Sequence, residues 1–268
     1  MAGVRNLPST EGQGERVNSR NPPPTLGQTD GFQLMLRAEP WRSTASGATV
    51  NASLVSGLNN PLGIAVSGGN LFVVNAGNGT IGEYTTSGAT VNPSLITGLN
   101  DTQGGIAISG SNLFVTNFFS GTIGEYTTTG ATVNASLITG LIFPTGIAVS
   151  GGNLFVTSLG TNNNGTIGGY TTSGATVNAS LITGLHAPTG IAVYGDNLFV
   201  MTLQGYAIGE YTTSGATVNA SLVSGLNSPY GITVVPEPSA FALGILGGLS
   251  FAVIGRRIRR KRLAALSA

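Results

Sequence analysis

The sequence contains no cysteine and a single histidine, His186, in 268 residues. Without cysteine the chain forms neither a disulfide framework nor a thiolate metal site, and one histidine excludes sites built from several imidazole ligands. Charged residues make up only 8% of the chain, against about 25% in ordinary soluble domains. Hydrophobic residues reach 41%, which is enough for a packed core.

Positive charge is missing from the middle of the chain. Lys and Arg are absent between Ser43 and Val235, whereas that stretch holds five acidic residues. Proteins bind nucleic acid by neutralising phosphates with Lys and Arg, so nucleic acid is excluded as a partner of this part. Six of the eleven basic residues form one cluster: Arg256, Arg257, Arg259, Arg260, Lys261 and Arg262.

Internal repetition is the strongest signal in the sequence. The phrase Ser/Thr-Gly-Ala-Thr-Val-Asn begins at Ser46, Ser87, Thr129, Ser173 and Ser214, with spacings of 41, 42, 44 and 41 residues. Periods in the forties are typical of four-stranded propeller blades and of HEAT-type helical repeats. The repeats are rich in Thr, Val, Ile, Gly and Asn, which favour strands over helices. We therefore predict an all-β fold.

Each repeat predicts four short strands. In one repeat these are residues 63–66, 71–74, 80–85 and 89–97, separated by Gly- and Asn-rich turns. The second run is apolar on both faces, as in a strand covered on both sides, and polarity then rises toward the last strand. We predict about four complete four-stranded blades over residues 61–226, in an open or incomplete propeller. A lone outer strand (49–58) precedes them and a lone inner strand (230–235) follows.

The repeat also resembles a known family. The pattern Pro-x-Gly-Ile-Ala-Val, then Gly-Gly-Asn-Leu-Phe-Val-x-Asn, then Gly-Thr-Ile-Gly-Glu-Tyr resembles NHL-type propeller repeats. It recurs from Pro61, Pro144, Pro188 and Pro229, with Gln103 in the equivalent place once. Residues 43–235 are therefore predicted to be an NHL-like β-propeller. A β-solenoid is the alternative, although its usual repeat is shorter.

Residues 1–42 lie outside the repeats. They contain three consecutive prolines and no apolar stretch of seven or more residues, so they lack the apolar core of a secretory signal. Their composition predicts a disordered segment. Because the closing blade is also partial, we expect the natural gene product to be longer or to start elsewhere.

A sixteen-residue stretch without charge, residues 240–255, precedes the basic cluster. As a helix it spans about 24 Å, against roughly 30 Å for the hydrocarbon core, and slight bilayer thinning with snorkelling arginines makes up the difference. A buried core helix is the alternative for so short a run. Six cations directly after it form a stop-transfer pattern, which places the basic residues in the cytoplasm and the propeller on the other side.

The tripeptide Pro236-Glu237-Pro238 stands just before this stretch. Together with the apolar stretch and the basic end, it resembles the PEP-CTERM sorting signal of bacterial exported proteins, over residues 236–262. That resemblance implies recognition by an exosortase-type membrane protease and cleavage near the motif. The two prolines hold the segment extended. We expect a membrane-anchored protein with its propeller outside the cytoplasm, or one released to the cell surface after processing.

Candidates for chemistry are few, and we predict no catalytic residue, metal site or cofactor. Glu83, Glu125 and Glu210 share one repeat position on the third strand, away from the axis, which favours a structural or solvated role. The recurring tyrosines are expected to pack between blades: Tyr84, Tyr126, Tyr170 and Tyr211. His186 is expected on a surface loop. Calcium needs about six oxygen ligands, usually with carboxylates, and the polar residues that follow the second strands lack a nearby acid: Asn75, Asn117, Ser158 and Thr202.

Two classes of function remain. The first is a non-enzymatic exported or surface protein whose propeller is a binding or display module for envelope polysaccharide or protein. The second is an NHL-like propeller hydrolase or lyase of the lactonase type, with a metal held by acids facing the channel. The fold alone does not separate them, because propellers carry many functions.

Overall fold

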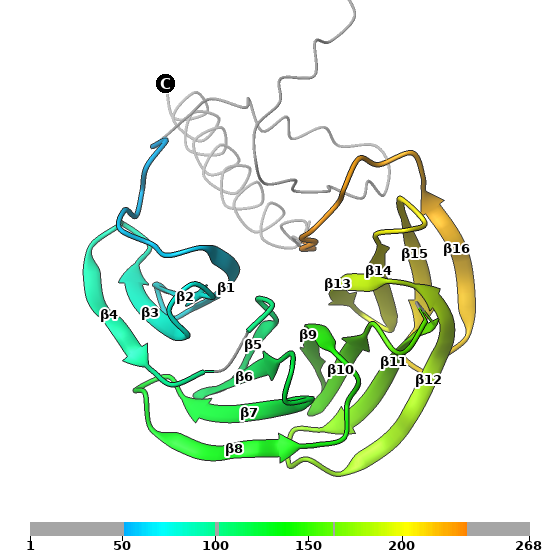
Figure 1. Ribbon diagram of the computed structural model, residues 1–268, viewed down its shortest axis with the longest axis horizontal. Coiled ribbons are helices and arrows are strands. Elements are labelled where there is room, and N and C mark those ends of the chain that lie inside the picture. Colours follow the sequence, from blue (N-terminus) through cyan, green and yellow to red (C-terminus); the bar gives the residue numbers. More distant parts are fainter. Residues whose placement is uncertain (1–50, 100–101, 163, 235–268) are drawn as a thin grey trace, which may run out of the picture. The chain divides into compact units, whose positions relative to one another are not determined.

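The computed structural model of the chain describes residues 51–99, 102–162 and 164–234. The predicted disordered segment 1–42 and the predicted sorting signal 236–262 lie outside these residues. The described residues belong to one compact unit and form sixteen strands in four antiparallel sheets of four. In each sheet the strands pair in chain order (Figure 1). The predicted all-β class and the four complete blades are confirmed, and the solenoid alternative is wrong.

The four blades have closely similar strand bounds. The first blade consists of β1 (Pro61–Ser67), β2 (Asn70–Asn75), β3 (Thr80–Thr85) and β4 (Thr90–Ile96). The second consists of β5 (Ile106–Ser109), β6 (Asn112–Asn117), β7 (Thr122–Thr127) and β8 (Thr132–Ile138). The third consists of β9 (Pro144–Ser150), β10 (Asn153–Ser158), β11 (Asn164–Thr171) and β12 (Thr176–His186). The fourth consists of β13 (Pro188–Tyr194), β14 (Asn197–Thr202), β15 (Ala207–Thr212) and β16 (Thr217–Val223).

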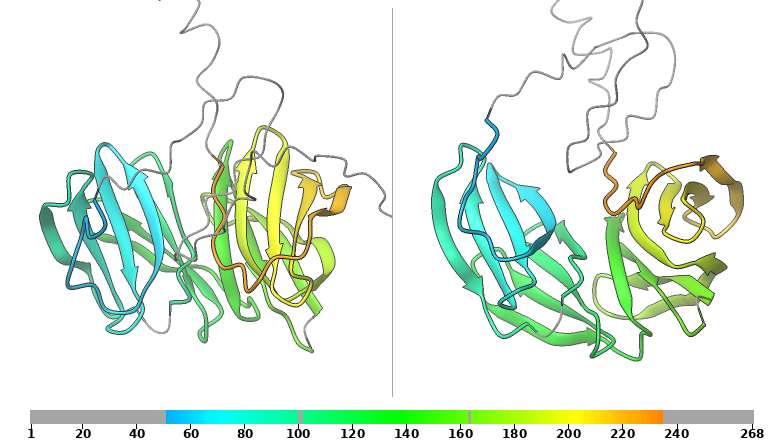
Figure 2. Two further views of the ribbon diagram at one scale, coloured as in Figure 1. Left: turned by 90° about the horizontal axis from the view of Figure 1, so that it is seen from above. Right: turned by 45° about the horizontal axis from the view of Figure 1, so that its top comes forward.

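The inner strands of successive blades contact one another. β1 contacts β5, β5 contacts β9, and β9 contacts β13. Figure 1 shows these strands innermost, with β4, β8, β12 and β16 at the rim, and Figure 2 shows the cyan first blade and the yellow fourth blade separated by the green blades. Within the described ranges, the first and fourth blades share no comparable strand contact.

Local sequence explains the hairpins that open the blades. Gly68 and Gly69, between β1 and β2, have φ angles of 58° and 85°. Two consecutive residues at positive φ make the type I′ turn, which matches the right-handed twist of adjoining strands and which glycine adopts without a steric penalty. The turn sets the register of Ser67 opposite Asn70.

The core lies between the blades. Successive residues of a second strand point to opposite faces, so every blade has two apolar faces. We call the face toward the next blade the leading face (Phe72, Val74 and Ile81 in the first blade). We call the other face the trailing face (Leu113, Val115 and Tyr126 in the second blade).

At the first joint these leading and trailing residues form one buried cluster. The same pattern recurs at the second and third joints. The tyrosines Tyr126, Tyr170 and Tyr211 lie in these three clusters, and Tyr84 lies in a further one. The prediction that they pack between blades is confirmed for Tyr126, Tyr170 and Tyr211, whereas Tyr84 packs against Val55 and Leu58 and not against another blade.

Neither of the two predicted lone strands forms a strand in the described residues. Residues 51–58 and 230–234 have no ladder, which corrects that prediction for this part of 49–58 and 230–235. The physical reason is that a strand needs a partner, and in the described residues no neighbouring strand lies beside either segment. Both segments nevertheless pack on a blade: Val55 and Leu58 on the first, and Ile232 and Val234 on the fourth.

Candidate functional site

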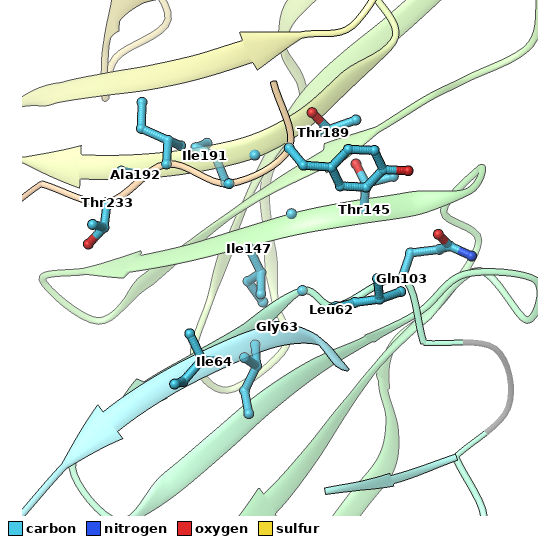
Figure 3. A pocket seen from close by; sticks show the side chains of 18 of the residues that line it. Leu62, Gly63, Ile64, Gln103, Thr145, Ile147, Thr189, Ile191, Ala192 and Thr233 are labelled. Atoms are coloured by element: carbon cyan, nitrogen blue, oxygen red, sulfur yellow. The ribbon is translucent and has the colours of Figure 1, made fainter. Parts of the chain in front are cut away.

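A cleft of about 800 Å³ lies along the inner strands of all four blades and the segment 230–234. Its apolar lining includes Leu62, Ile64, Ile147 and Ile191, and Figure 3 shows these side chains around it. The polar side chains in its lining are an amide and hydroxyls: Gln103, Thr145, Thr189, Tyr230 and Thr233. None of the lining residues carries a carboxylate, an ammonium or a guanidinium group. Such a surface suits an uncharged ligand.

Backbones approach closely where the blades meet beside the cleft. A Cβ atom on Gly105 would collide with the carbonyl oxygen of Thr145, and one on Gly146 with that of Thr189. Glycine at these positions therefore lets each inner strand lie directly against the next.

Threonine hydroxyls join the blades at the same level. The Thr116 hydroxyl donates to the carbonyl oxygen of Thr145, over 3.1 Å. The Thr145 hydroxyl lies 2.9 Å from that of Thr157 and 2.9 Å from the carbonyl oxygen of Pro188.

The Thr157 hydroxyl accepts from the Gly146 N–H over 2.7 Å and lies 3.1 Å from the carbonyl oxygen of Thr189. Val74 and Met201 occupy the equivalent positions in the first and fourth blades. Bonds of this kind therefore mark the second and third joints.

Three phenylalanines cluster at one end of the cleft. Phe118, which lines the cleft, has ring-centroid distances of 5.0 Å to Phe119 and 5.1 Å to Phe143. Phe119 is 65% exposed. We call these three residues the aromatic cluster.

Phe143 has a φ of 54°, at the position where Asn60 has a φ of 48°. Asparagine tolerates this left-handed conformation, but a bulky side chain rarely adopts it. The left-handed conformation itself recurs at this position of the repeat, at Ala187 and Ser228. The repeat pattern did not predict the aromatic cluster, although Phe118 and Phe119 stand where the first repeat has Ala76 and Gly77.

The recurring acids hold strands together within their own blades. The Asn70 side-chain amide donates to Glu83 over 2.7 Å, and the same bond recurs from Asn112 to Glu125 and from Asn197 to Glu210. These acids do not line the cleft. The structural role predicted for them is confirmed.

The polar residues at the ends of the second strands serve nearby loops. Asn75 accepts from the backbone N–H of Asn59 over 3.2 Å, and the Asn117 amide donates to Thr122 over 3.1 Å. The structure brings none of Asn75, Asn117, Ser158 and Thr202 into the lining of the cleft. Within the described residues, no three side chains of His, Asp or Glu gather closely enough to hold a metal ion.

His186 is exposed, as predicted, but it does not lie in a loop. β12 extends to His186, which pairs with Asn164 at the start of β11, and its side chain is exposed.

Burial raises the pKa of Tyr126, Tyr170 and Tyr211 above the usual tyrosine value.

The predicted sorting residues and the predicted membrane helix 240–255 lie outside the described residues. These are Pro236, Glu237 and Pro238 with the basic residues Arg256, Arg257, Arg259, Arg260, Lys261 and Arg262. In the part of the chain that the structure describes, no helix combines the length and hydropathy needed to span a bilayer.

The described residues thus form a β-propeller of four blades. No family model and no curated protein matches the chain. Similar solved structures include a chain of the nidogen/laminin complex, with 17% identity, 66% of this chain and 85% of that chain covered, and a TM-score of 0.48.

Two others are virginiamycin B lyase from Staphylococcus aureus and Kuenenia stuttgartiensis hydrazine synthase. The lyase has 22% identity and a TM-score of 0.49, with 65% of this chain and 59% of that chain covered. The synthase has 18% identity and a TM-score of 0.47, with 66% and 53% covered. The chain therefore spans little more than half the length of these two.

Proposed function

We propose that the protein is a non-enzymatic, exported surface protein of a bacterium. Its propeller is a binding or display module, and residues 236–262 are a PEP-CTERM sorting signal that anchors the chain in the membrane. One observation carries this proposal: Pro-Glu-Pro, sixteen uncharged residues and six cations follow one another in that order.

Physical chemistry supports the anchoring step. A charge at the centre of a membrane helix costs about 2.5–3.5 kcal/mol on insertion scales, and residues 240–255 carry none. Each cation of the basic cluster gains on the order of 1 kcal/mol at an anionic inner surface. Pro236 and Pro238 keep helix from continuing upstream, which leaves an extended peptide at the outer face for an exosortase-type protease.

The cleft and the aromatic cluster support the binding role. The lining combines apolar side chains with hydroxyl and amide groups, and it lies beside exposed phenylalanine rings. Such a surface contacts neutral ligands through packing and a few hydrogen bonds. Envelope polysaccharide and envelope protein are the partners that fit this role, and no cofactor is required for it.

The test uses the full chain in a bacterial host that carries an exosortase. We expect the chain to fractionate with membranes and to be processed. Replacing Pro236, Glu237 and Pro238 together by alanine should leave insertion intact and block processing. A chain that ends at Val235 is the control and should leave the membrane fraction. Normal processing of the triple variant would contradict the sorting signal, and a full chain that never enters the membrane fraction would contradict the anchor.

A further inference from the structure

The trailing face of the first blade is only half covered. Ile64 and Val66 of β1 are 60% and 62% exposed. The residues equivalent to Ile64 in the other blades are 9%, 6% and 7% exposed: Ile106, Ile147 and Ile191. In those blades the preceding leading face covers the isoleucine. The inner half of this face therefore has no neighbouring strand among the described residues.

The outer half of the same face is covered by residues 51–58. Val55 and Leu58 pack against Leu71, Val73 and Tyr84. Ile96 and Leu99 pack in the same way against the trailing face of the second blade, and the sequences Ser-Leu-Val-Ser-Gly-Leu and Ser-Leu-Ile-Thr-Gly-Leu place Val55 and Leu58 in their positions. Residues 51–58 thus occupy the place of an outer strand of a further blade.

The inner half of the leading face of the fourth blade is covered by residues 230–234. Ile232 and Val234 pack against Phe199, Met201 and Ile208, as Ile106 and Ile108 pack against the first blade. A Cβ atom on Gly190 would lie 3.2 Å from the Ile232 side chain. Residues 230–234 therefore occupy the place of the inner strand of the same further blade.

We propose that the space between these two segments is a docking site for a β-hairpin that supplies the second and third strands of this blade. We call it the closing joint, formed by residues 51–58, residues 230–234 and the blade faces beneath them. The hairpin is a segment with the chemistry of β2 and β3, provided by another polypeptide.

The faces of the closing joint specify the side chains of that hairpin. Phe, Val and Ile side chains would cover the trailing face of the first blade, because Phe72, Val74 and Ile81 of the first blade cover the trailing face of the second blade in this way. Leu, Val and Tyr side chains would cover the leading face of the fourth blade, because Leu198, Val200 and Tyr211 of the fourth blade cover the leading face of the third blade. Residues 70–85 of this chain carry both sets on alternate positions.

Backbone pairing is available on both sides of the hairpin. β3 pairs with β4 through Ile81 with Ile96 and Glu83 with Asn92, and Val55 and Asn51 stand at the equivalent positions of the outer segment. The other hairpin strand pairs with residues 230–234 as β2 pairs with β1. Main-chain bonds of this kind supply affinity, and the pockets for alternate side chains supply specificity.

Two occupants from the same sequence fit less well. The residues directly before the outer segment place Pro40 and Trp41 where the first repeat has Ile81 and Gly82, and proline removes a ladder hydrogen bond from a central strand. A second copy of the described residues offers four such hairpins, but each is already paired within its own sheet.

The experiment adds a synthetic peptide with the sequence of residues 70–85 to the full chain in detergent micelles. Titration calorimetry measures binding, and hydrogen exchange reports on the two end segments. We expect saturable 1:1 binding and slower exchange in residues 51–58 and 230–234, which have no ladder in the chain alone. A peptide with Leu71, Phe72, Val73 and Val74 replaced by serine is the matched control and should not bind.

A variant of the protein makes the test specific. Ile64→Asp changes an exposed side chain, so it should fold, and it should weaken binding roughly tenfold or more because a carboxylate would be buried under the hairpin. Absence of binding to the unmodified chain would overturn the proposal. So would protection of residues 51–58 and 230–234 without peptide, whether in a monomer, where the chain's own residues fill the joint, or in a dimer, where a second copy does.

Discussion

The hydroxyl of Thr157 lies 3.1 Å from the carbonyl oxygen of Thr189, and this hydrogen bond connects the third blade to the fourth. Thr157 is fully buried, and the same hydroxyl accepts from the N–H of Gly146 over 2.7 Å. A single side chain thus serves the inner strands of two blades. This joint therefore combines an apolar cluster with hydrogen bonds.

Thr157→Val should destabilise the propeller by about 1–3 kcal/mol, because it leaves the buried Gly146 N–H without its partner while keeping the side-chain shape. Urea unfolding monitored by circular dichroism measures the change. Thr132→Val, on an exposed position of β8, is the control and should stay within about 0.5 kcal/mol. Equal effects of the two variants would show that the hydroxyl does not stabilise the joint.

Gly168→Ala should destabilise the fold by about 1–3 kcal/mol. A Cβ atom there would lie 2.6 Å from the hydroxyl oxygen of Tyr170, so the ring would have to move out of the second joint. Gly169→Ala is a matched control on the same strand, because the nearest atoms to its Cβ would lie 3.8 Å away. Thermal unfolding of both variants separates crowding by the tyrosine from the loss of glycine itself.

Stability should fall as the pH rises above about 10. Burial raises the pKa of Tyr126, Tyr170 and Tyr211 in the folded chain, so above the unfolded-state pKa the unfolded chain loses these protons first. The stabilisation is complete below that pH and is lost as the pH rises toward the folded-state values. Replacing all three by phenylalanine should remove most of the change in the urea unfolding midpoint between about pH 9 and about pH 11. An unchanged pH dependence would contradict this origin.

Phe119→Ser should leave stability within about 0.5 kcal/mol, because the ring is largely exposed. Under the proposed binding role it should reduce retention of the protein on isolated cell-envelope fragments. Val177→Ser, which changes another exposed apolar residue on the rim strand β12, is the control and should not affect retention. Sedimentation of the protein with envelope fragments measures both. Equal retention of the Phe119 variant would argue against the aromatic cluster as a contact surface.

The strand pattern could be predicted because it is local. The predicted runs 63–66, 71–74 and 80–85 fall within β1, β2 and β3, since turn residues and apolar runs repeat with one period. The end segments could not be predicted in the same way. Residues 51–58 and 230–234 have the sequence of strands, but whether they form a ladder depends on a partner that is distant in the chain.

The cleft and its surroundings depend on contacts between blades, which the sequence did not reveal. Thr116 and Thr157 stand where the first repeat has Val74, and Phe118 and Phe119 depart from the repeat in the second blade. These departures were the available signal. These residues take their roles from contacts between strands that are distant in the sequence, because β9 lies beside both β6 and β13.

Nearly identical joints have a consequence for the gene. Because each blade carries the same two faces, inserting or deleting one whole repeat of 41–44 residues joins a leading face to a trailing face that already match. Recombination between such similar DNA segments therefore changes the length of the protein in steps of one blade without a new interface having to evolve.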